Sequence, residues 1–321
     1  MNPPLANVAN PLPERWQMRR LAYDGCCSGA WWGGASQLFV IDGSPNQRAA
    51  IFAWNTAPEV DPAASLVGLN MPAPPPLASP DGALQIRRDG NQIVIRRAAA
   101  GSEWTVETQN TLPAVSADSS RLMWEIAVPR APGEDRSRTQ IWVSDVDGAN
   151  ARQIANEPGG YARWLDGSRL LLGARPEQTT AWTVFNTADD SSFTLGARDF
   201  VRGLSIAPGG ARILFYLVNQ DDPAAAGIYA LDMQPDAQAR RLPFFGAWRW
   251  RDADTLYYLP FDPASDLQSL HYYDLRTGED RGLIEPSFLV ANGDWSVSPD
   301  GDQIAFWNAN DLTLWLLEGV P

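Results

Sequence analysis

A hairpin motif that recurs along the whole chain constrains this sequence more than any other feature. Its clearest copy, WSVSPDG, runs from Trp295 to Gly301 and stands between two apolar segments. Seven copies align on the last position of that motif, at Gly34, Gly82, Ser119, Gly167, Gly210, Ala253 and Gly301. Successive copies are 37 to 48 residues apart. Such a period, with strand patterns inside each repeat, is typical of propeller blades.

Each repeat has the pattern of four β-strands. A short first strand, such as residues 162–165, leads into an Asp-Gly turn, which reverses the chain because Gly tolerates positive φ and Asp bonds nearby backbone. An apolar second strand follows, then an alternating third strand and a weaker fourth strand. The sequence therefore predicts an all-β, seven-bladed β-propeller of four-stranded antiparallel blades, with six blades as the alternative.

The two ends of the chain complement each other in this pattern. The seventh copy stops at Pro321 without a fourth strand, and residues 15–24 resemble the fourth strands of other repeats. We expect this N-terminal strand to close the ring, because an unpaired edge invites aggregation. Residues 1–14 are then a linker-like lead, and residues 15–321 form a single propeller domain with a Pro-rich excursion at 60–78.

The motif carries a family resemblance. The segment WSVSPDGDQIAF, from Trp295 to Phe306, and its looser copies resemble the TolB-like (WD40-like) propeller repeat. That repeat also occurs in propeller domains of prolyl-oligopeptidase-type enzymes, so the resemblance implies a propeller that binds proteins or accompanies a catalytic domain. Relatives are often periplasmic, which implies an extracytoplasmic location. The N-terminus has no signal-peptide pattern, so a cytoplasmic location is the alternative.

Composition excludes several classes of chemistry. The net charge of −13 disfavours nucleic acid and anionic membranes as partners. All 25 basic residues are Arg, and the only His is His271, so Lys-based catalysis and most zinc sites lack their residues. The sequence also contains no Gly-x-Ser-x-Gly nucleophile elbow. Some TolB-like propellers are polysaccharide lyases whose metal is held by several His, which one His cannot provide. The sequence predicts no catalytic residue, no metal and no cofactor.

The adjacent pair Cys26 and Cys27 is the sharpest local feature. It lies in a predicted turn between the closing strand and the first blade. A strained vicinal disulfide, two free buried thiols and a redox-active pair all remain open.

Function is expected on the variable loops. In an antiparallel blade, the loops between the second and third strands share one face with those that lead to the next blade, and here both sets are long and varied. These loops are rich in Asp, with a local basic spot, which favours a basic or polar partner. The candidate binding residues are Arg136, Arg138, Asp221, Asp222, Asp262 and Asp266.

The expected function is a monomeric, non-catalytic propeller that recognises an unidentified protein or ligand, as part of an exported or cell-envelope protein without direct membrane insertion. The first alternative is an enzyme-accessory propeller that gates a catalytic domain outside this chain. The second is a hydrolase that acts at the central channel.

Overall fold

The computed structural model describes residues 12–21, 29–42, 50–57, 64–68, 77–80, 82–90, 92–130, 132–133, 136–261, 269–283, 290–308 and 313–320. In these segments the chain is almost entirely β, and its two short 3₁₀ helices are η1 (Pro208–Gly210) and η2 (Pro223–Ala225). No helix in the described segments is long and apolar enough to cross a membrane.

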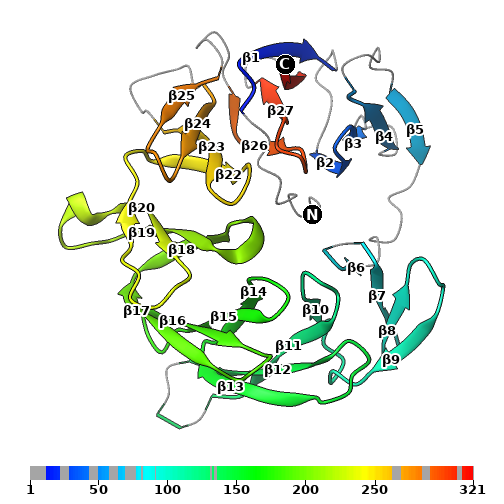
Figure 1. Ribbon diagram of the computed structural model, residues 1–321, viewed down its shortest axis with the longest axis vertical. Coiled ribbons are helices and arrows are strands. Elements are labelled where there is room, and N and C mark those ends of the chain that lie inside the picture. Colours follow the sequence, from blue (N-terminus) through cyan, green and yellow to red (C-terminus); the bar gives the residue numbers. More distant parts are fainter. Residues whose placement is uncertain are drawn as a thin grey trace. The chain divides into compact units, whose positions relative to one another are not determined.

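The strands form seven four-stranded antiparallel sheets, which confirms the predicted seven-bladed β-propeller (Figure 1). The chain divides into two compact units, Met1–Pro75 with Phe244–Pro321, and Pro76–Pro243. The second unit holds four blades, built from β6 (Leu77–Ala78), β7 (Leu84–Asp89), β8 (Gln92–Arg97) and β9 (Glu103–Val106); β10 (Ala114–Val115), β11 (Arg121–Val128), β12 (Arg138–Asp145) and β13 (Arg152–Pro158); β14 (Tyr161–Trp164), β15 (Arg169–Ala174), β16 (Thr179–Asn186) and β17 (Ser192–Asp199); and β18 (Val201–Ile206), β19 (Arg212–Leu217), β20 (Gly227–Asp232) and β21 (Arg240–Arg241).

The first unit holds the other three blades. They are built from β22 (Gly246–Trp250), β23 (Thr255–Pro260), β24 (His271–Asp274) and β25 (Asp280–Gly282); β26 (Val290–Val297), β27 (Gln303–Asn308), β28 (Leu314–Val320) and β1 (Arg15–Arg20); and β2 (Gly29–Gly34), β3 (Gln37–Asp42), β4 (Ala50–Asn55) and β5 (Ala64–Gly68). The strands β5 and β6 lie inside the segment 60–78 that the sequence assigned to an extended excursion. Residues 64–68 pair antiparallel with β4, from Ala64 opposite Trp54 to Gly68 opposite Ile51.

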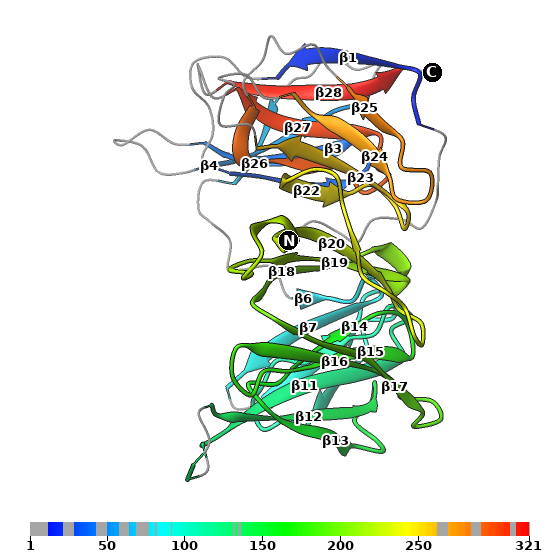
Figure 2. The ribbon, with the colours of Figure 1, turned by 90° about the vertical axis from the view of Figure 1, so that its left-hand side faces the viewer.

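The N-terminal strand completes the last blade, as predicted. β1 pairs antiparallel with β28 along its full length, from Arg15 opposite Val320 to Arg20 opposite Trp315 (Figure 2). Gln17 Nε2 also donates a hydrogen bond of 2.9 Å to Glu318 Oε1 on β28. The first and last segments of the sequence therefore share one sheet, and β1 covers the edge that β28 would otherwise expose.

The repeated turn explains why the hairpins recur. In the last copy, Ser298 Oγ accepts a hydrogen bond of 2.9 Å from the backbone N–H of Gln303, and Gly301 has φ of +80°. In the second copy, Ser79 Oγ accepts the same bond from Leu84 at 2.9 Å, and Gly82 has φ of +72°. The motif therefore specifies the turn through a Ser hydroxyl and a residue that tolerates positive φ.

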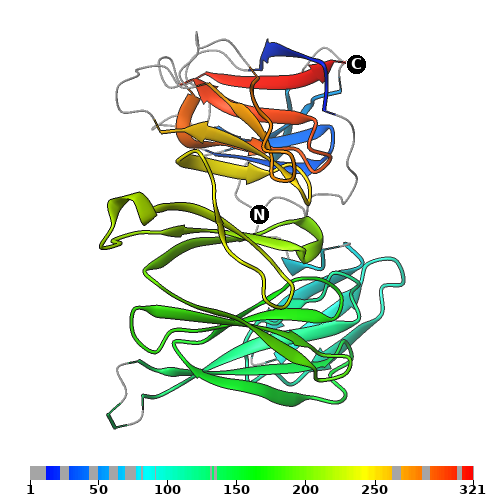
Figure 3. The same cartoon turned by 60° about the vertical axis from the view of Figure 1, so that its left-hand side comes forward.

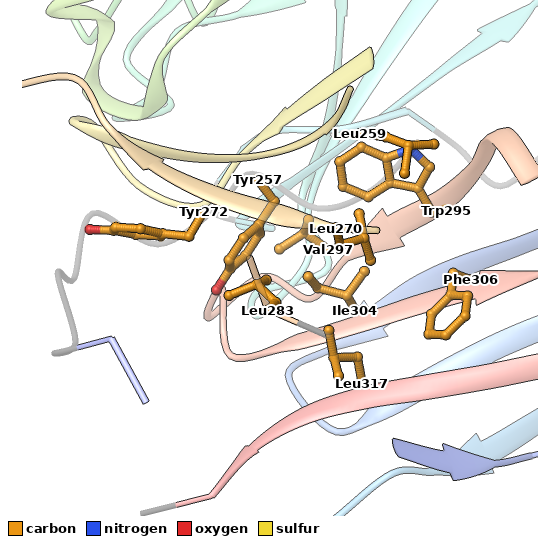
Figure 4. Close-up of a cluster of buried hydrophobic side chains, with 10 residues drawn as sticks. All are labelled: Tyr257, Leu259, Leu270, Tyr272, Leu283, Trp295, Val297, Ile304, Phe306 and Leu317. Atoms are coloured by element: carbon orange, nitrogen blue, oxygen red, sulfur yellow. The ribbon is translucent and has the colours of Figure 1, made fainter. Parts of the chain in front are cut away.

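Neighbouring blades within each unit pack through alternate faces of their strands. On β27, Ile304 and Phe306 face the β22–β25 blade, whereas Ala305 between them faces the β2–β5 blade. Figure 4 shows the first of these clusters, with Trp295 and Tyr257 packed among aliphatic side chains. The large apolar residues of the repeat are therefore core, as the two-residue period of a strand requires.

Candidate functional site

The second unit contains a pair of connected hollows at the loop ends of three consecutive blades. The loops that meet there join β11 to β12, β15 to β16 and β19 to β20, and the shorter links join β13 to β14 and β17 to β18. These are second-to-third and blade-to-blade connections, which emerge on the same side of antiparallel blades. The hollows therefore lie on the face that the sequence marked as the variable one.

The two hollows differ in their lining. The one lined mostly by loop residues, called the outer hollow, is polar, and the one whose lining includes residues of β14, called the inner hollow, is partly apolar. The outer hollow, of about 370 Å³, is lined by Arg136, Arg175, Glu177, Gln178, Thr180, Phe200, Arg202 and Asn219. The inner hollow, of about 480 Å³, is lined by Gly159, Gly160, Tyr161, Arg163, Arg175, Leu204 and Ile206. Arg175 belongs to both, and the inner hollow reaches the first strands of two blades, β14 and β18. Volumes of this size suit a small ligand or the end of a larger one.

Tyr161 lines the inner hollow, and three adjacent strands hold its ring in place. On β15, Gly173 stands opposite both Tyr161 of β14 and Trp182 of β16. The Tyr161 ring crosses Gly173 to reach Trp182, whose Nε1 donates a hydrogen bond of 2.7 Å to Tyr161 Oη. A Cβ at position 173 would stand 2.2 Å from Tyr161 Cζ, so only Gly permits this crossing. The long strands of this blade are drawn in green in Figure 3.

Tyr161 in turn positions two guanidinium groups. Arg163 Cζ lies 5.8 Å and Arg175 Cζ lies 5.2 Å from the centre of the Tyr161 ring, within the range of a cation–π contact. Arg175 Nε donates a hydrogen bond of 3.2 Å to Thr180 Oγ1. This bond fixes the guanidinium without using its two terminal nitrogens.

The hollows carry an excess of positive charge in an acidic protein. Of the described residues, four arginines line them against one glutamate, Glu177, a formal excess of three positive charges. Arg163 is paired with Glu125 at 3.2 Å. Within the described segments, Arg136, Arg175 and Arg202 form no ion pair with a carboxylate. Three guanidinium groups are therefore available to an anion that enters the outer hollow.

A local irregularity accompanies Arg202. The register between β18 and β19 shifts between Arg202 and Ser205, and Gly203 has φ of +61°. Such bulges redirect a side chain relative to a regular strand. Arg202 Nη1 donates a hydrogen bond of 2.9 Å to the carbonyl of Val201, which leaves its other donors available at the hollow.

The candidate residues proposed from the sequence have different places. Arg136 lines the outer hollow, whereas Arg138 is the first residue of β12 and donates hydrogen bonds to the Asn156 side chain and carbonyl. Asp221 and Asp222 lie in the β19–β20 loop, where Asp222 Oδ1 accepts a hydrogen bond of 2.9 Å from the N–H of Ala224 and caps η2. The candidates Cys26, Cys27, Asp262 and Asp266 lie outside the described residues.

Sequence reasoning missed Tyr161, Arg175 and Arg202. The loop that contains Arg175 was identified as variable, but its basic residue was not singled out. A usable signal existed: Arg136, Arg175 and Arg202 each stand within a few residues of a predicted connection on the same face. That signal becomes specific only when the blades are known to be neighbours.

His271 takes part in a separate polar cluster on β23, β24 and β25. Its Nδ1 lies 3.0 Å from Asp280 Oδ1, and Tyr258 Oη donates a hydrogen bond of 2.7 Å to Asp280 Oδ2. Burial, with Asp280 beside it, raises the pKa of the Tyr258 hydroxyl. Across the described segments, no three His, Cys, Asp or Glu side chains are grouped so as to hold a metal ion.

No family model and no curated protein matches the chain. Solved structures of similar fold include an oligogalacturonate lyase in complex with manganese, 16% identical with a TM-score of 0.57, where the match covers 99% of this chain and 97% of the lyase. Porphyromonas gingivalis dipeptidyl peptidase 4 is 14% identical with a TM-score of 0.56, over 87% of this chain and 48% of the peptidase. Pyrococcus horikoshii acylaminoacyl peptidase is 15% identical with a TM-score of 0.54, over 89% of this chain and 50% of the peptidase.

At these identities the likeness shows the fold, and the chain spans about half the length of the two peptidases. The expectation of a non-catalytic recognition module is nevertheless corrected by the comparisons, because these structures of the same fold belong to enzymes. The described residues do not fit the manganese of the lyase, since the one histidine is engaged with Asp280 and no group of three ligands is present among them. The chain is a β-propeller whose fold is similar to parts or the whole of these enzymes.

Proposed function

We propose that this chain is a TolB-like propeller that serves an enzyme, and that it binds and admits substrate for a catalytic domain outside residues 1–321. The observation that carries the proposal is the pair of hollows lined by Tyr161, Arg175 and their neighbours. They open among the variable loops and continue to the first strands of two blades. In propellers the first strand is the innermost strand of each blade, so a ligand bound there reaches the inner edge of two neighbouring blades.

The site is suited to binding rather than to bond cleavage. Its positively charged groups are guanidiniums, which stay protonated at all physiological pH values and therefore neither accept nor release a proton during a reaction. Among the described residues that line the two hollows, Glu177 is the single carboxylate. General acid–base catalysis normally uses a pair of groups whose pKa values differ. The arrangement supports capture and orientation of an anionic substrate, with the chemistry supplied by a partner domain.

The proposal includes a location and a partner. The TolB-like motif favours an extracytoplasmic location, and the partner that we propose is a peptide hydrolase, the enzyme class of the two half-length matches. The propeller itself is proposed to be monomeric, without affinity for nucleic acid, because its net charge is −13. Cell fractionation with compartment markers tests the location directly.

The test of the function is a native purification from the source organism. The gene is tagged at its own locus, and the purified protein is treated with a fluorophosphonate probe that labels active serine hydrolases. We expect one labelled hydrolase, in the same polypeptide or in a stoichiometric complex, and we expect Arg175→Gln to change its turnover of long peptides more than that of small chromogenic substrates. Turnover of the same substrates by residues 1–321 alone, or a native preparation without a labelled hydrolase, would contradict the proposal.

A further inference from the structure

We infer that the two hollows together bind the C-terminal carboxylate of a peptide whose last side chain is apolar. The inference rests on the proposed function in one respect only, that the peptide is a substrate or product of the partner enzyme. It is carried by the charge of the outer hollow, the apolar wall of the inner hollow and the way in which Arg175 is held between them.

The outer hollow supplies the anion recognition. Arg136, Arg175 and Arg202 line it and form no ion pair within the described part of the chain. A guanidinium presents parallel N–H donors that match the two oxygens of a carboxylate. Arg175 is the best positioned of the three, because its Nε is bonded to Thr180 Oγ1 and its plane lies near the Tyr161 ring, which orients its terminal nitrogens before a ligand arrives.

The inner hollow selects what is attached to the carboxylate. Leu204 and Ile206 of β18 supply an apolar wall beside the half-buried Tyr161. A sugar ring packs best on a bare aromatic face, but Arg163 and Arg175 both lie near the Tyr161 ring and compete for its faces. An aliphatic or aromatic side chain on the aliphatic wall therefore suits the space better than a chain of acidic sugars. A volume of about 480 Å³ accommodates such a side chain together with its backbone.

Glu177 places one negative charge in the outer hollow, beside the arginines. Its carboxylate lines the same hollow as the three unpaired arginines and makes no ion pair within the described residues. It therefore repels a bound carboxylate while it competes for the same guanidiniums. Removal of its charge is expected to tighten binding of an acid, an effect that damage to the fold cannot produce.

The test uses the full chain and a pair of fluorescein-labelled tetrapeptides that end in leucine, one with a free C-terminal acid and one with a C-terminal amide. Binding is followed by fluorescence anisotropy at fixed ionic strength. We expect the acid to bind at least tenfold more tightly than the amide, since a charge-assisted hydrogen bond to a guanidinium is lost in the amide. Arg175→Gln should lower the affinity for the acid about tenfold and leave that for the amide unchanged, whereas Glu177→Gln should raise the affinity for the acid severalfold.

Arg96→Gln is the matched control, because Arg96 is an exposed arginine on β8 that lines neither hollow. Equal affinities for acid and amide, an equal loss in the Arg96 variant, or a Glu177 variant that binds the acid more weakly would each overturn the inference. So would stronger competition by oligogalacturonate or inorganic phosphate than by an unlabelled peptide acid. The assay contains no catalytic domain, so a missing hydrolase overturns the proposed function alone, and equal binding of acid and amide overturns this site alone.

Discussion

The crossing of Tyr161 over Gly173 gives the most decisive test of how the site is built. In Gly173→Ala, the new Cβ would stand 2.2 Å from Tyr161 Cζ, 2.3 Å from Cε1 and 2.7 Å from Oη. Ordinary contact begins at 3.4 Å, so the ring has to move by at least 1.2 Å, the difference between 3.4 Å and 2.2 Å. That movement breaks the 2.7 Å hydrogen bond from Trp182 Nε1.

The magnitude follows from two separate costs. Overpacking a buried site costs about 1–3 kcal/mol. Trp182 is 1% exposed, and leaving its buried N–H without a partner costs a further ~1–3 kcal/mol. We therefore expect Gly173→Ala to lower the free energy of unfolding by about 2–6 kcal/mol. The measurement is urea-induced unfolding, followed by tryptophan fluorescence.

A double-mutant cycle separates this mechanism from a general intolerance of the strand. In a Tyr161→Ala background the ring is gone, so Ala at position 173 should be neutral or stabilise by about 0.5–1 kcal/mol, as Ala does relative to Gly within strands. Gly282→Ala is the control, because a Cβ there meets nothing within 4 Å. The reasoning is refuted if Gly173→Ala destabilises the two backgrounds equally.

Three further outcomes are expected. Deletion of residues 1–20 removes β1 with the half-buried Trp16 and Met18, which pack against the cluster of Figure 4. Thermal unfolding should then shift to lower temperature by an amount equivalent to about 3 kcal/mol, and light scattering should reveal aggregation at the uncovered β28 edge. An unchanged melting temperature contradicts the pairing of β1 with β28. Arg251 lies buried between Asp252 and Asp302, at 3.1 Å from each. Arg251→Ala should therefore lower the free energy of unfolding, measured by urea titration, by about 3–5 kcal/mol. A decrease below about 1 kcal/mol would show that the hydrogen bonds of its turn compensate the Asp252 carboxylate without Arg251. For Asp118, burial alone would raise the pKa, but hydrogen bonds from Ser116 and Ser120 outweigh it and hold the pKa below its ordinary value. The ionised Asp118 therefore stabilises the fold above about pH 4, and this stabilisation is lost as the pH falls through the folded-state pKa. The difference in melting temperature between wild type and Asp118→Asn should shrink from pH 6 to pH 3, and a constant difference refutes the assignment.

The fold was predictable because its determinants are local and repeated. Each feature of the turn lies within a few residues of sequence, although no single feature occurs in all seven copies. A Ser hydroxyl accepts the backbone hydrogen bond at Ser79, Ser116 and Ser298, and the aligned residue has positive φ at Gly82, Ser119, Gly210 and Gly301. The copy at Ala253, where the motif reads RDAD, keeps the Asp of the turn, since Asp252 Oδ1 accepts hydrogen bonds from the N–H groups of Asp254 and Thr255. The closing strand was predictable for the related reason that an unpaired β28 edge is unfavourable.

The candidate site was harder to predict because its members come from three blades. Arg136, Arg175 and Arg202 are 39 and 27 residues apart in sequence, and each alone is an ordinary loop or strand-end arginine. Gly173 carried a hidden signal: a Gly in the middle of an apolar strand often marks a close approach of another group. The sequence does not say which group approaches, because Tyr161 reaches Gly173 only through the pairing of β14 with β15.

The lining of the hollows differs in sign of charge from the chain as a whole. With a net charge of −13, and with loops that are rich in Asp, the sequence favoured a basic or polar partner. Near the hollow, however, acidic side chains form local hydrogen bonds and ion pairs. Asp222 caps η2, and Asp199 accepts a hydrogen bond from Thr179 Oγ1. Glu125 is paired with Arg163 and also accepts a 2.6 Å hydrogen bond from the N–H of Ala162. Asp and Asn side chains readily form hydrogen bonds with nearby backbone N–H groups, so the carboxylates of an acidic loop can be engaged within the loop's own turns. An arginine has five N–H donors and a long side chain, so a single bond to a nearby carbonyl, as between Arg202 Nη1 and Val201, leaves other donors available at the hollow. A local excess of guanidinium groups can therefore form on a protein whose total charge is strongly negative.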